Sequence, residues 1–319
     1  MHYPEDEAFV PPGVLFENIS SIEEEQSLLE EKRICELSEL SDAAAAHLFS
    51  LVGGGMPLSD ALPLVRCIGE SSASLHSLAL EQSGEHLIRH ASYLSRLDKA
   101  LFVKLLLKRL SDSGVFVREE DFLSLIPTSE VFTYVKNLYA DEAYEVFSEQ
   151  FSDPRVFYSD TVRAAVLAVE EGRAGYCLLP LEEKGGVRLA SIAEMLYRSE
   201  LHIASVTPVY GYGEQTDLTY ALVSRTYRIP PVVSEDDRYL ELRISKETCA
   251  LAELLLGAEA FGVAVYRIHS AVLEGEGGRA PCYSLVLRSE GKDFSALLAY
   301  LSIFFKDFSI VGIYSNLEA

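Results

Sequence analysis

Three patterns of hydrophobic and polar residues follow one another along the chain. In the first, over residues 1–125, apolar residues recur at helical spacing, most regularly in Leu37–Val52 and in His76–Leu110. A glycine triplet, Gly53–Gly55, interrupts this pattern and predicts a hinge or a helix end. We therefore expect a helical N-terminal region.

The second pattern, over residues 126–228, alternates short apolar stretches with helical ones. Strands are expected at Val131–Val135, Val156–Tyr158, Tyr176–Pro180, Leu201–Val209 and Leu218–Ser224. Helices are expected at Ala140–Phe151, Asp160–Glu171 and Leu189–Ser199. Such alternation is typical of a mainly parallel sheet covered by helices, so this region is predicted to be an α/β domain.

The third pattern begins after a proline-containing, acidic linker and occupies residues 238–319. Four strands are expected at Tyr239–Ser245, Val263–Ser270, Tyr283–Arg288 and Ser309–Tyr314. Helices are expected at Thr248–Phe261 and Phe294–Phe305, with a loop at Gly275–Pro281 between the two middle strands. The order βαββαβ predicts a ferredoxin-like α+β module, of a kind suited to sensing or docking.

Composition narrows the choice of partners. The 319 residues carry a formal net charge of −22, which repels phosphate backbones and anionic lipid headgroups, so neither nucleic acid nor a membrane surface is expected as a partner. The first twelve residues lack the basic-then-apolar order of a secretory signal, and a soluble cytoplasmic protein is expected. The five cysteines contain no CxxC pair, which favours reduced thiols over a disulfide framework.

Metal and cofactor signals are weak. His86 and His90 are spaced to share one helix face, but no third ligand accompanies them, so a solvated face explains them better. Gly53–Gly55 lacks the lysine and hydroxyl residue that follow in a phosphate-binding loop. We expect no cofactor and no metal.

Two stretches resemble the prephenate dehydratase family. Val169–Tyr176 is similar to a helix end of that family, and Leu179–Val187 to the loop that follows it. The C-terminal module resembles the ACT domain that follows the dehydratase domain: Cys249–Leu251 stands at the family's Gly-Ala-Leu, and Ile268–Ser270 at its Ile-Glu-Ser. The resemblance implies a periplasmic-binding-protein-like α/β domain, an ACT regulatory domain and a role in phenylalanine biosynthesis or its regulation.

The same resemblance supplies candidate site residues. Glu182 stands at the carboxylate of the family's loop, and Thr219 at the hydroxyl of its Thr-Arg-Phe motif, so both are candidate catalytic residues. Lys184 and Arg188 are the nearby cations that could hold a substrate carboxylate. The corresponding effector positions are Cys249, Ala250, Leu251, His269 and Ser270.

Departures from the family indicate lost catalysis. The family's glycine-rich opening falls on Tyr134–Ala140, which has no glycine, and Tyr220 replaces the motif's arginine. Only residues 210–218 separate the strand ending at Val209 from that motif, where the family has a second lobe, so the α/β domain is expected to be truncated.

Three hypotheses follow for function. The first is a catalytically degenerate dehydratase relative that binds an aromatic amino acid or a prephenate-like acid. The second is a non-enzymatic small-molecule sensor or dimerisation scaffold, with a homodimer formed through the ACT-like module. The third places chorismate mutase activity in the helical region, using the cations Arg89, Arg96, Lys99, Lys104 and Arg109.

Overall fold

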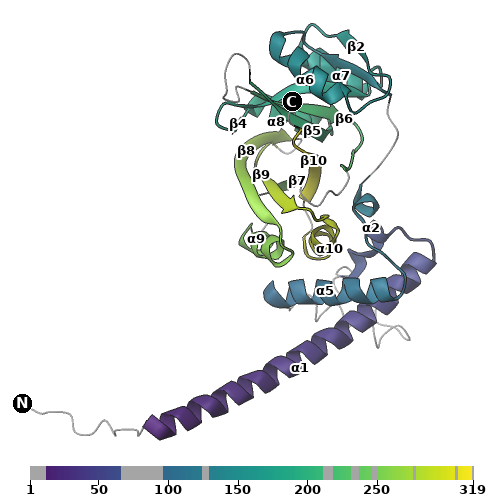
Figure 1. Ribbon diagram of the computed structural model, residues 1–319. Helices are drawn as coiled ribbons and strands as arrows, with labels where there is room; N and C mark the ends of the chain where they lie inside the picture. The colour runs from purple at the N-terminus through teal and green to yellow at the C-terminus, as the bar shows by residue number, and fades with distance from the viewer. Residues whose placement is uncertain are drawn as a thin grey trace, which may run out of the picture.

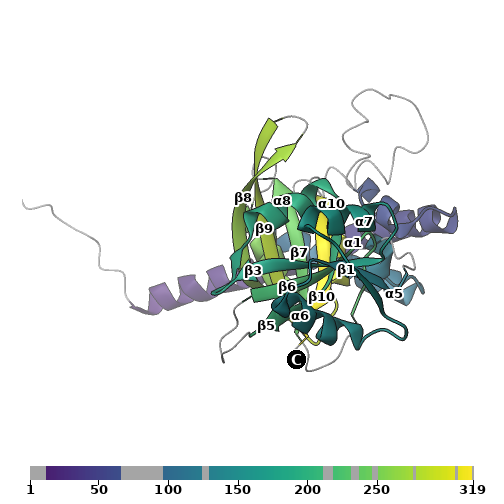
Figure 2. The ribbon, with the colours of Figure 1, turned by 90° about the horizontal axis from the view of Figure 1, so that it is seen from above.

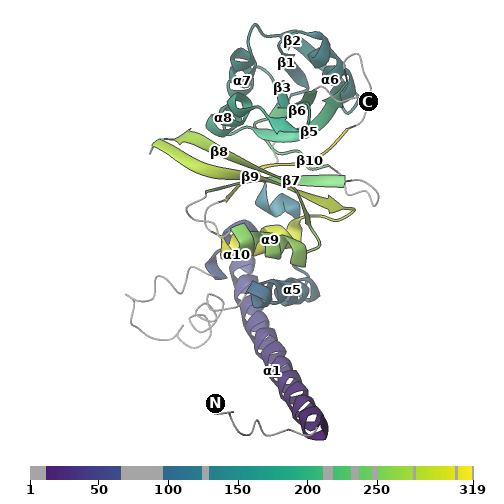
Figure 3. The same ribbon diagram turned by 90° about the vertical axis from the view of Figure 1, so that its left-hand side faces the viewer.

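The computed structural model describes residues 12–65, 96–123, 129–210, 218–230, 237–245, 251–275, 278–305 and 308–317. The described elements are stacked in layers. An α/β part lies on one face of the C-terminal sheet, two helices cover the other face, and the N-terminal helices lie beyond them (Figures 1 and 3).

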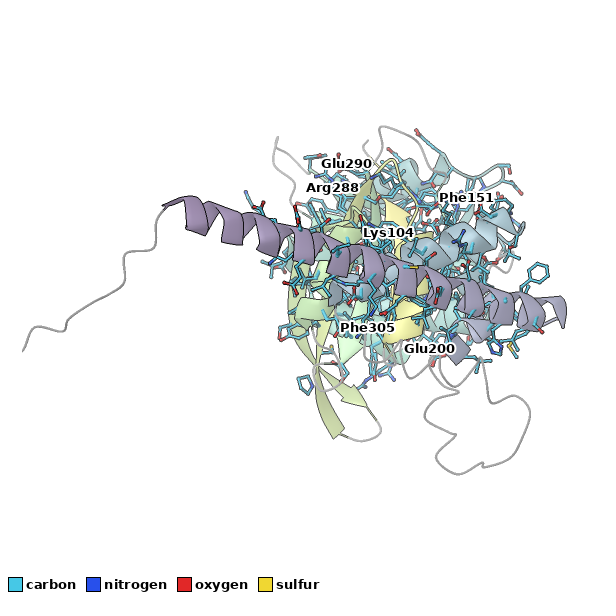
Figure 4. All side chains as sticks on the ribbon, turned by 90° about the horizontal axis from the view of Figure 1, so that it is seen from below. Lys104, Phe151, Glu200, Arg288, Glu290 and Phe305 are labelled. Atoms are coloured by element: carbon cyan, nitrogen blue, oxygen red, sulfur yellow. The ribbon has the colours of Figure 1, made fainter. Side chains whose placement is uncertain are left out.

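The N-terminal region is helical, as predicted. It contains α1 (Pro12–Gly53), α2 (Leu58–Ala61), α5 (Arg96–Asp112) and the short 3₁₀ helix η1 (Glu119–Phe122). Helix α5 packs against α1 and also against the two C-terminal helices, with Phe102, Leu106 and Leu110 fully buried. Seen from below, α1 crosses this layer and projects beyond it, and its residues 23–36 are exposed (Figure 4). No helix in the described ranges is long and apolar enough to cross a membrane.

The α/β part follows the predicted order of elements. These are β1 (Val131–Tyr134), α6 (Leu138–Ser148), β2 (Arg155–Tyr158), α7 (Val162–Glu170), β3 (Tyr176–Glu183), β4 (Val187–Arg188), α8 (Ala190–Arg198), β5 (His202–Val209) and β6 (Leu218–Ser224). Strand β1 pairs in parallel with β2 and β3, but β6 is antiparallel to both β3 and β5. The sheet is therefore mixed, because β6 returns alongside β5 instead of crossing over through a helix. In the described chain, β5 is followed in the sheet by β6, with no second α/β lobe between them.

The C-terminal module has the predicted βαββαβ order and is ferredoxin-like. It consists of β7 (Asp237–Ser245), α9 (Leu251–Ala260), β8 (Ala264–Gly275), β9 (Gly278–Glu290), α10 (Ser295–Phe304) and β10 (Phe308–Ser315). Its strands lie in the order β10-β7-β9-β8, each antiparallel to its neighbour, and α9 and α10 cover one face.

The prediction of a loop at Gly275–Pro281 is wrong. Strands β8 and β9 continue through most of it, with Val272 opposite Pro281 and Gly275 opposite Gly278. The glycines and the proline in this segment suggested a loop. A two-stranded arm tolerates them, because proline lacks a backbone N–H and an outer edge requires no hydrogen bond from that position. The arm extends beyond the body of the molecule (Figure 2).

The two β regions form one continuous sheet. Strand β10 pairs in parallel with β5, with Gly312 opposite Ile203. A Cβ atom added to Gly312 would lie 2.3 Å from the carbonyl oxygen of Ile203, so only glycine permits this approach. The α/β part and the C-terminal module are thereby held in one fixed arrangement.

A buried ion pair attaches the N-terminal region to this body. Arg238 of β7 is fully buried, and its Nη1 and Nη2 donate to the two carboxylate oxygens of Glu119 in η1 at 3.0 and 2.7 Å. Glu119 also accepts the backbone N–H of Phe294 at 2.6 Å, and Arg238 donates to the carbonyl of Pro230 at 3.1 Å. These bonds satisfy both Nη atoms of Arg238 and both carboxylate oxygens of Glu119, while Nε of Arg238 is buried without a hydrogen-bond partner in the described residues.

We predict that Glu119→Ala lowers the free energy of unfolding by about 3–5 kcal/mol, because it leaves the Arg238 guanidinium buried without its carboxylate. Urea denaturation of the full chain measures this. The matched control is Glu120→Ala at the exposed neighbouring position, which should change stability by less than about 0.5 kcal/mol. Equal effects of the two substitutions would contradict the structural role of the pair.

We also predict that Gly312→Ala destabilises the chain by about 1–3 kcal/mol, because the new methyl group meets the Ile203 carbonyl. Hydrogen exchange should locate the loss of protection in β5 and β10. Gly53→Ala is the control, since a Cβ there meets nothing within 4 Å. A neutral Gly312→Ala would show that the β5–β10 approach is looser than described.

Candidate functional site

One face of the C-terminal sheet is polar where it meets the α/β part. Along β7, the apolar residues Leu240, Leu242 and Ile244 face α9 and α10, so the alternate residues Tyr239, Glu241 and Arg243 face the α/β part. We name this interface the seam. Its α/β side is β3, β4 and α8, and its other side is Tyr239, Glu241 and Arg243 with Arg267 and His269 of β8.

A buried ion pair lies in the middle of the seam. Arg188 of β4 donates from Nη2 to Oε2 of Glu241 at 2.6 Å, and these side chains are only 7% and 4% exposed. Ser284 donates to Oε1 of Glu241 at 2.7 Å and Tyr314 to Oε2 at 3.1 Å. Both carboxylate oxygens of Glu241 are therefore occupied.

These contacts shift the pKa values of Glu241, Arg188 and Tyr314. Burial alone would raise the pKa of Glu241, but Arg188 and the hydrogen bonds from Ser284 and Tyr314 hold that pKa below its ordinary value. Burial would likewise lower the pKa of Arg188, yet Glu241 outweighs it and the pKa is raised. Burial, together with the charge of Glu241, raises the pKa of Tyr314 well above its usual range. Glu241 and Arg188 are thus ionised, and Tyr314 keeps its proton.

The predicted carboxylate Glu182 lies beside this pair. Its Oε2 forms a short hydrogen-bonded ion pair with Nη1 of Arg267, and its Oε1 lies 3.9 Å from both Nε of Arg188 and Nε2 of His269. A separation of 3.9 Å is too long for a hydrogen bond, and His269 Nε2 is buried without a partner in the described chain. Burial and the charge of Arg188 lower the pKa of His269, so this imidazole is neutral.

A β-bulge in β8 directs Arg267 toward Glu182. The register between β8 and β9 shifts between Val265 and Arg267, so the neighbouring side chains of Tyr266 and Arg267 lie on the same face. The guanidinium of Arg267 stacks 4.7 Å from the Tyr266 ring centroid. On the opposite side it lies against Gly186, where φ is +77° and a Cβ atom would come within 2.5 Å of Nη1. The turn between β3 and β4 therefore needs glycine at this position.

A cavity of about 380 Å³ opens at the end of the seam next to Glu182. We name it the tyrosine cavity. Tyr239 lies 5.1 Å from Tyr266 and 5.9 Å from Tyr314 between ring centroids, and these three rings form its wall. Its other lining residues are Leu181, Glu182, Glu183, Gly185, Gly186, Val206, Pro208, Thr219, Arg267, Val286 and Asn316.

The structure brings together four of the residues that the sequence singled out. Thr219 of β6 lies directly opposite Glu182 of β3, and both line the tyrosine cavity. Arg188 and His269 meet Glu182 from β4 and β8. Strand pairing places Arg188 and Thr219 beside Glu182, whereas His269 approaches it from the other side of the seam.

The other candidates lie elsewhere. Lys184 is exposed on the turn between β3 and β4. Ser270 follows His269 on β8 and so faces the opposite side of the sheet, and Leu251 begins α9 on that side. Leu251 and Ser270 thus lie on the opposite face of the sheet from His269. Cys249, Ala250, His86 and His90 lie outside the described residues.

Three of the cations considered for a mutase, Lys99, Lys104 and Arg109, serve as packing contacts, and Arg89 lies outside the described residues. Lys99 forms an ion pair with Glu253 of α9, and Arg109 pairs with Asp42 of α1 at 2.6 Å. Lys104 lies 5.7 Å from the Phe261 ring centroid. These contacts hold α5 against its neighbours and add no observation in favour of the mutase hypothesis.

Sequence reasoning missed Glu241, Arg267 and the three tyrosines. A signal for Glu241 was present, because Glu241 and Arg243 alternate with Leu240, Leu242 and Ile244 and so mark a second, polar face of the strand. No local signal in the sequence pointed to Arg267, since the direction of its side chain depends on the β-bulge.

The arrangement can bind a polar molecule with an aromatic body. Three aromatic rings offer apolar surface, while Arg267, Glu182, Thr219 and Asn316 supply charge and hydrogen bonds at the same cavity. Within the described ranges, no group of three or more His, Cys, Asp or Glu residues is placed to hold a metal ion.

No family model matches this sequence, and no curated protein does. Among solved structures, a chain described as GqqA, a novel type of quorum quenching acylase, is 22% identical, with 59% of this chain and 95% of that chain covered and a TM-score of 0.45. A prephenate dehydratase from Streptococcus mutans is 12% identical, with coverages of 59% and 100% and a TM-score of 0.48. A prephenate dehydratase from Arthrobacter aurescens in complex with L-Phe is 14% identical, with coverages of 58% and 90% and a TM-score of 0.44. We therefore infer the function of this chain from the side chains of the seam.

The Glu241 carboxylate predicts a dependence of stability on pH. Its folded pKa lies below the ordinary 4.5, so the unfolded chain takes up this proton first as the pH falls. The stability that ionised Glu241 contributes is therefore fully present above about pH 4.5 and is lost as the pH falls further, toward the folded pKa. We expect Glu241→Gln to cost about 3–5 kcal/mol at pH 7 and the gap to wild type to narrow between about pH 5 and 3.

Urea denaturation of both proteins across this range measures the gap. Glu145→Gln, at an exposed position on α6, is the control and should leave the curve unchanged. A gap that stays constant from pH 7 to 3 would contradict an ionised Glu241 in the seam.

Proposed function

We propose that the chain is a catalytically degenerate relative of prephenate dehydratase that binds an aromatic amino acid in the tyrosine cavity and acts as a regulatory sensor. The observation that carries the proposal is one cavity with three tyrosine rings and an adjacent Arg267–Glu182 pair. The eight-residue gap between β5 and β6 and the motif resemblance in Val169–Val187 support the relationship to the family.

The Arg267–Glu182 pair suits a zwitterion. A guanidinium accepts an α-carboxylate in a bidentate manner, and a neighbouring carboxylate accepts an α-ammonium group. An amino acid inserted between the two would replace one ion pair with two, while its side chain would lie against Tyr239 and Tyr266. The Thr219 hydroxyl and the Asn316 amide line the same cavity and can bond the ligand further.

Efficient dehydration of prephenate demands more than these groups offer. The reaction needs an acid for the departing hydroxyl and donors for two carboxylates. Of the two arginines near Glu182, Arg188 is committed to Glu241, and Arg267 is bound to Glu182 itself. Lys184 is exposed on its turn, away from both. The seam thus favours binding over turnover.

The C-terminal module is the proposed regulatory unit. In an ACT-like role its sheet would sense the ligand through Tyr239, Tyr266 and Arg267, which lie on the face toward the α/β part. Association of two copies through this module stays a prediction.

The proposal is tested by two assays on the full chain. L-phenylalanine, L-tyrosine and L-tryptophan are screened by thermal shift, with L-leucine as the aliphatic control; an aromatic ligand at about ten times its Kd should raise Tm by about 2–4 °C. Prephenate is incubated with high concentrations of the protein, and phenylpyruvate formation should not exceed the uncatalysed rate.

Arg267→Gln should weaken binding of the aromatic amino acid at least about tenfold, because a charge-assisted contact is lost. Arg163→Gln, at an exposed position on α7, is the matched control and should bind as wild type does. Absence of a shift with every aromatic amino acid would refute the binding role. Prephenate turnover that is lost in Thr219→Val would refute the degenerate state.

A further inference from the structure

A second cavity lies at the opposite end of the seam. Its volume is about 670 Å³, and it opens where β5 and β10 begin and β7 ends. We name it the Arg243 cavity. Its lining residues are Glu170, Leu196, Tyr197, Arg198, Ser199, Glu200, Leu201, His202, Arg225, Tyr227, Arg243, Ser309, Ile310 and Val311. The Arg188–Glu241 pair stands between this cavity and the tyrosine cavity, because Glu241 lies between Tyr239 and Arg243 on β7.

Among the described residues, no carboxylate pairs with the guanidinium of Arg243. Its contact in the described chain is with the ring of Tyr197, 4.7 Å from the centroid, and no described carboxylate lies within ion-pair distance of it. Glu241, two residues away on the same face, already bonds Arg188, Ser284 and Tyr314. The negative charge of Glu241 is therefore compensated by Arg188, which lies closer to it than Arg243 does.

The buried carboxylates of the seam are outnumbered by the guanidinium groups around them. Arg188, Arg243 and Arg267 surround the carboxylates of Glu182 and Glu241, while Glu183 is exposed and Glu194 pairs with Arg198. Partly buried charges are normally paired, because desolvation of an isolated ion is costly. In a chain with a formal net charge of −22, acidic residues are abundant, yet none within the described ranges is placed on Arg243.

A second polar atom beside this arginine also lacks a partner. Nδ1 of His202 is buried and forms no hydrogen bond within the described residues. Its ring stacks on Tyr227, with 3.7 Å between centroids. Burial and the charge of Arg243 lower the pKa of His202 to about 4, against backbone hydrogen bonds at Ile310 and Val311 that raise it, so the imidazole is neutral and adds no charge at neutral pH.

We propose that the Arg243 cavity is a separate binding site for a small monocarboxylate with an apolar or aromatic body. Arg243 holds the carboxylate, His202 supplies a hydrogen bond, and Tyr197 and Tyr227 lie against the apolar part. Among the lining residues, Arg198, Arg225 and Arg243 outnumber Glu170 and Glu200 by one charge, which matches a monoanion better than a dianionic phosphate. The site does not depend on ligand binding in the tyrosine cavity.

The test is calorimetric titration of the full chain with phenylacetate, with 2-phenylethanol as the uncharged probe and inorganic phosphate as the dianion. We expect phenylacetate to bind and the other two to bind at least about tenfold more weakly. Arg243→Gln should weaken phenylacetate binding at least about tenfold by the same reasoning, whereas Arg155→Gln, at an exposed position on β2, should not.

Arg267→Gln distinguishes the two cavities. It alters the tyrosine cavity alone, so it should leave phenylacetate binding unchanged. Arg243→Lys keeps the charge and should bind between wild type and Arg243→Gln, which keeps the test decisive if the glutamine variant does not fold. The proposal is overturned if wild type does not bind phenylacetate, if phosphate or 2-phenylethanol binds equally well, or if Arg267→Gln rather than an Arg243 variant removes binding.

Discussion

The Arg188–Glu241 ion pair is the contact on which the arrangement of the seam depends. Two charges at 2.6 Å with almost no exposure require further hydrogen bonds to offset their desolvation, and Ser284 and Tyr314 supply these to Glu241. Because the pair is buried between β4 and the C-terminal sheet, it fixes the separation of the two layers. Cavities remain at both ends of the seam, with the Glu182–Arg267 pair beside the tyrosine cavity.

Backbone pairing supports the same arrangement. The close approach of Gly312 to Ile203 joins β10 to β5, so the C-terminal module cannot turn independently of the α/β part. Glu119 and Arg238 then attach the helical layer from the opposite side. The seam is thus a rigid site between layers, in which a few polar side chains are held in place for ligand contacts.

The sequence predicted the elements better than their contacts. Alternation of apolar residues placed β3, β5 and β7, and the cap at Thr161, which accepts the Ala164 N–H, placed the start of α7. It could not supply the partner of Arg188, because Glu241 is far along the chain and only tertiary packing brings them together. The β8–β9 arm was missed because glycine and proline are turn signals that a free two-stranded arm tolerates. Glu182 and Thr219 were found through their resemblance to a family motif, whereas Arg267 depends on a bulge that has no local signature.

Hydrogen–deuterium exchange of the full chain with and without L-phenylalanine tests the central claim most directly. If the ligand binds in the seam between the layers, amides of the β3–β4 turn and of β8 around Arg267 should gain protection together, while those of α1 and α5 do not change. Protection confined to other elements, or none at saturating ligand, would contradict a ligand site in the seam.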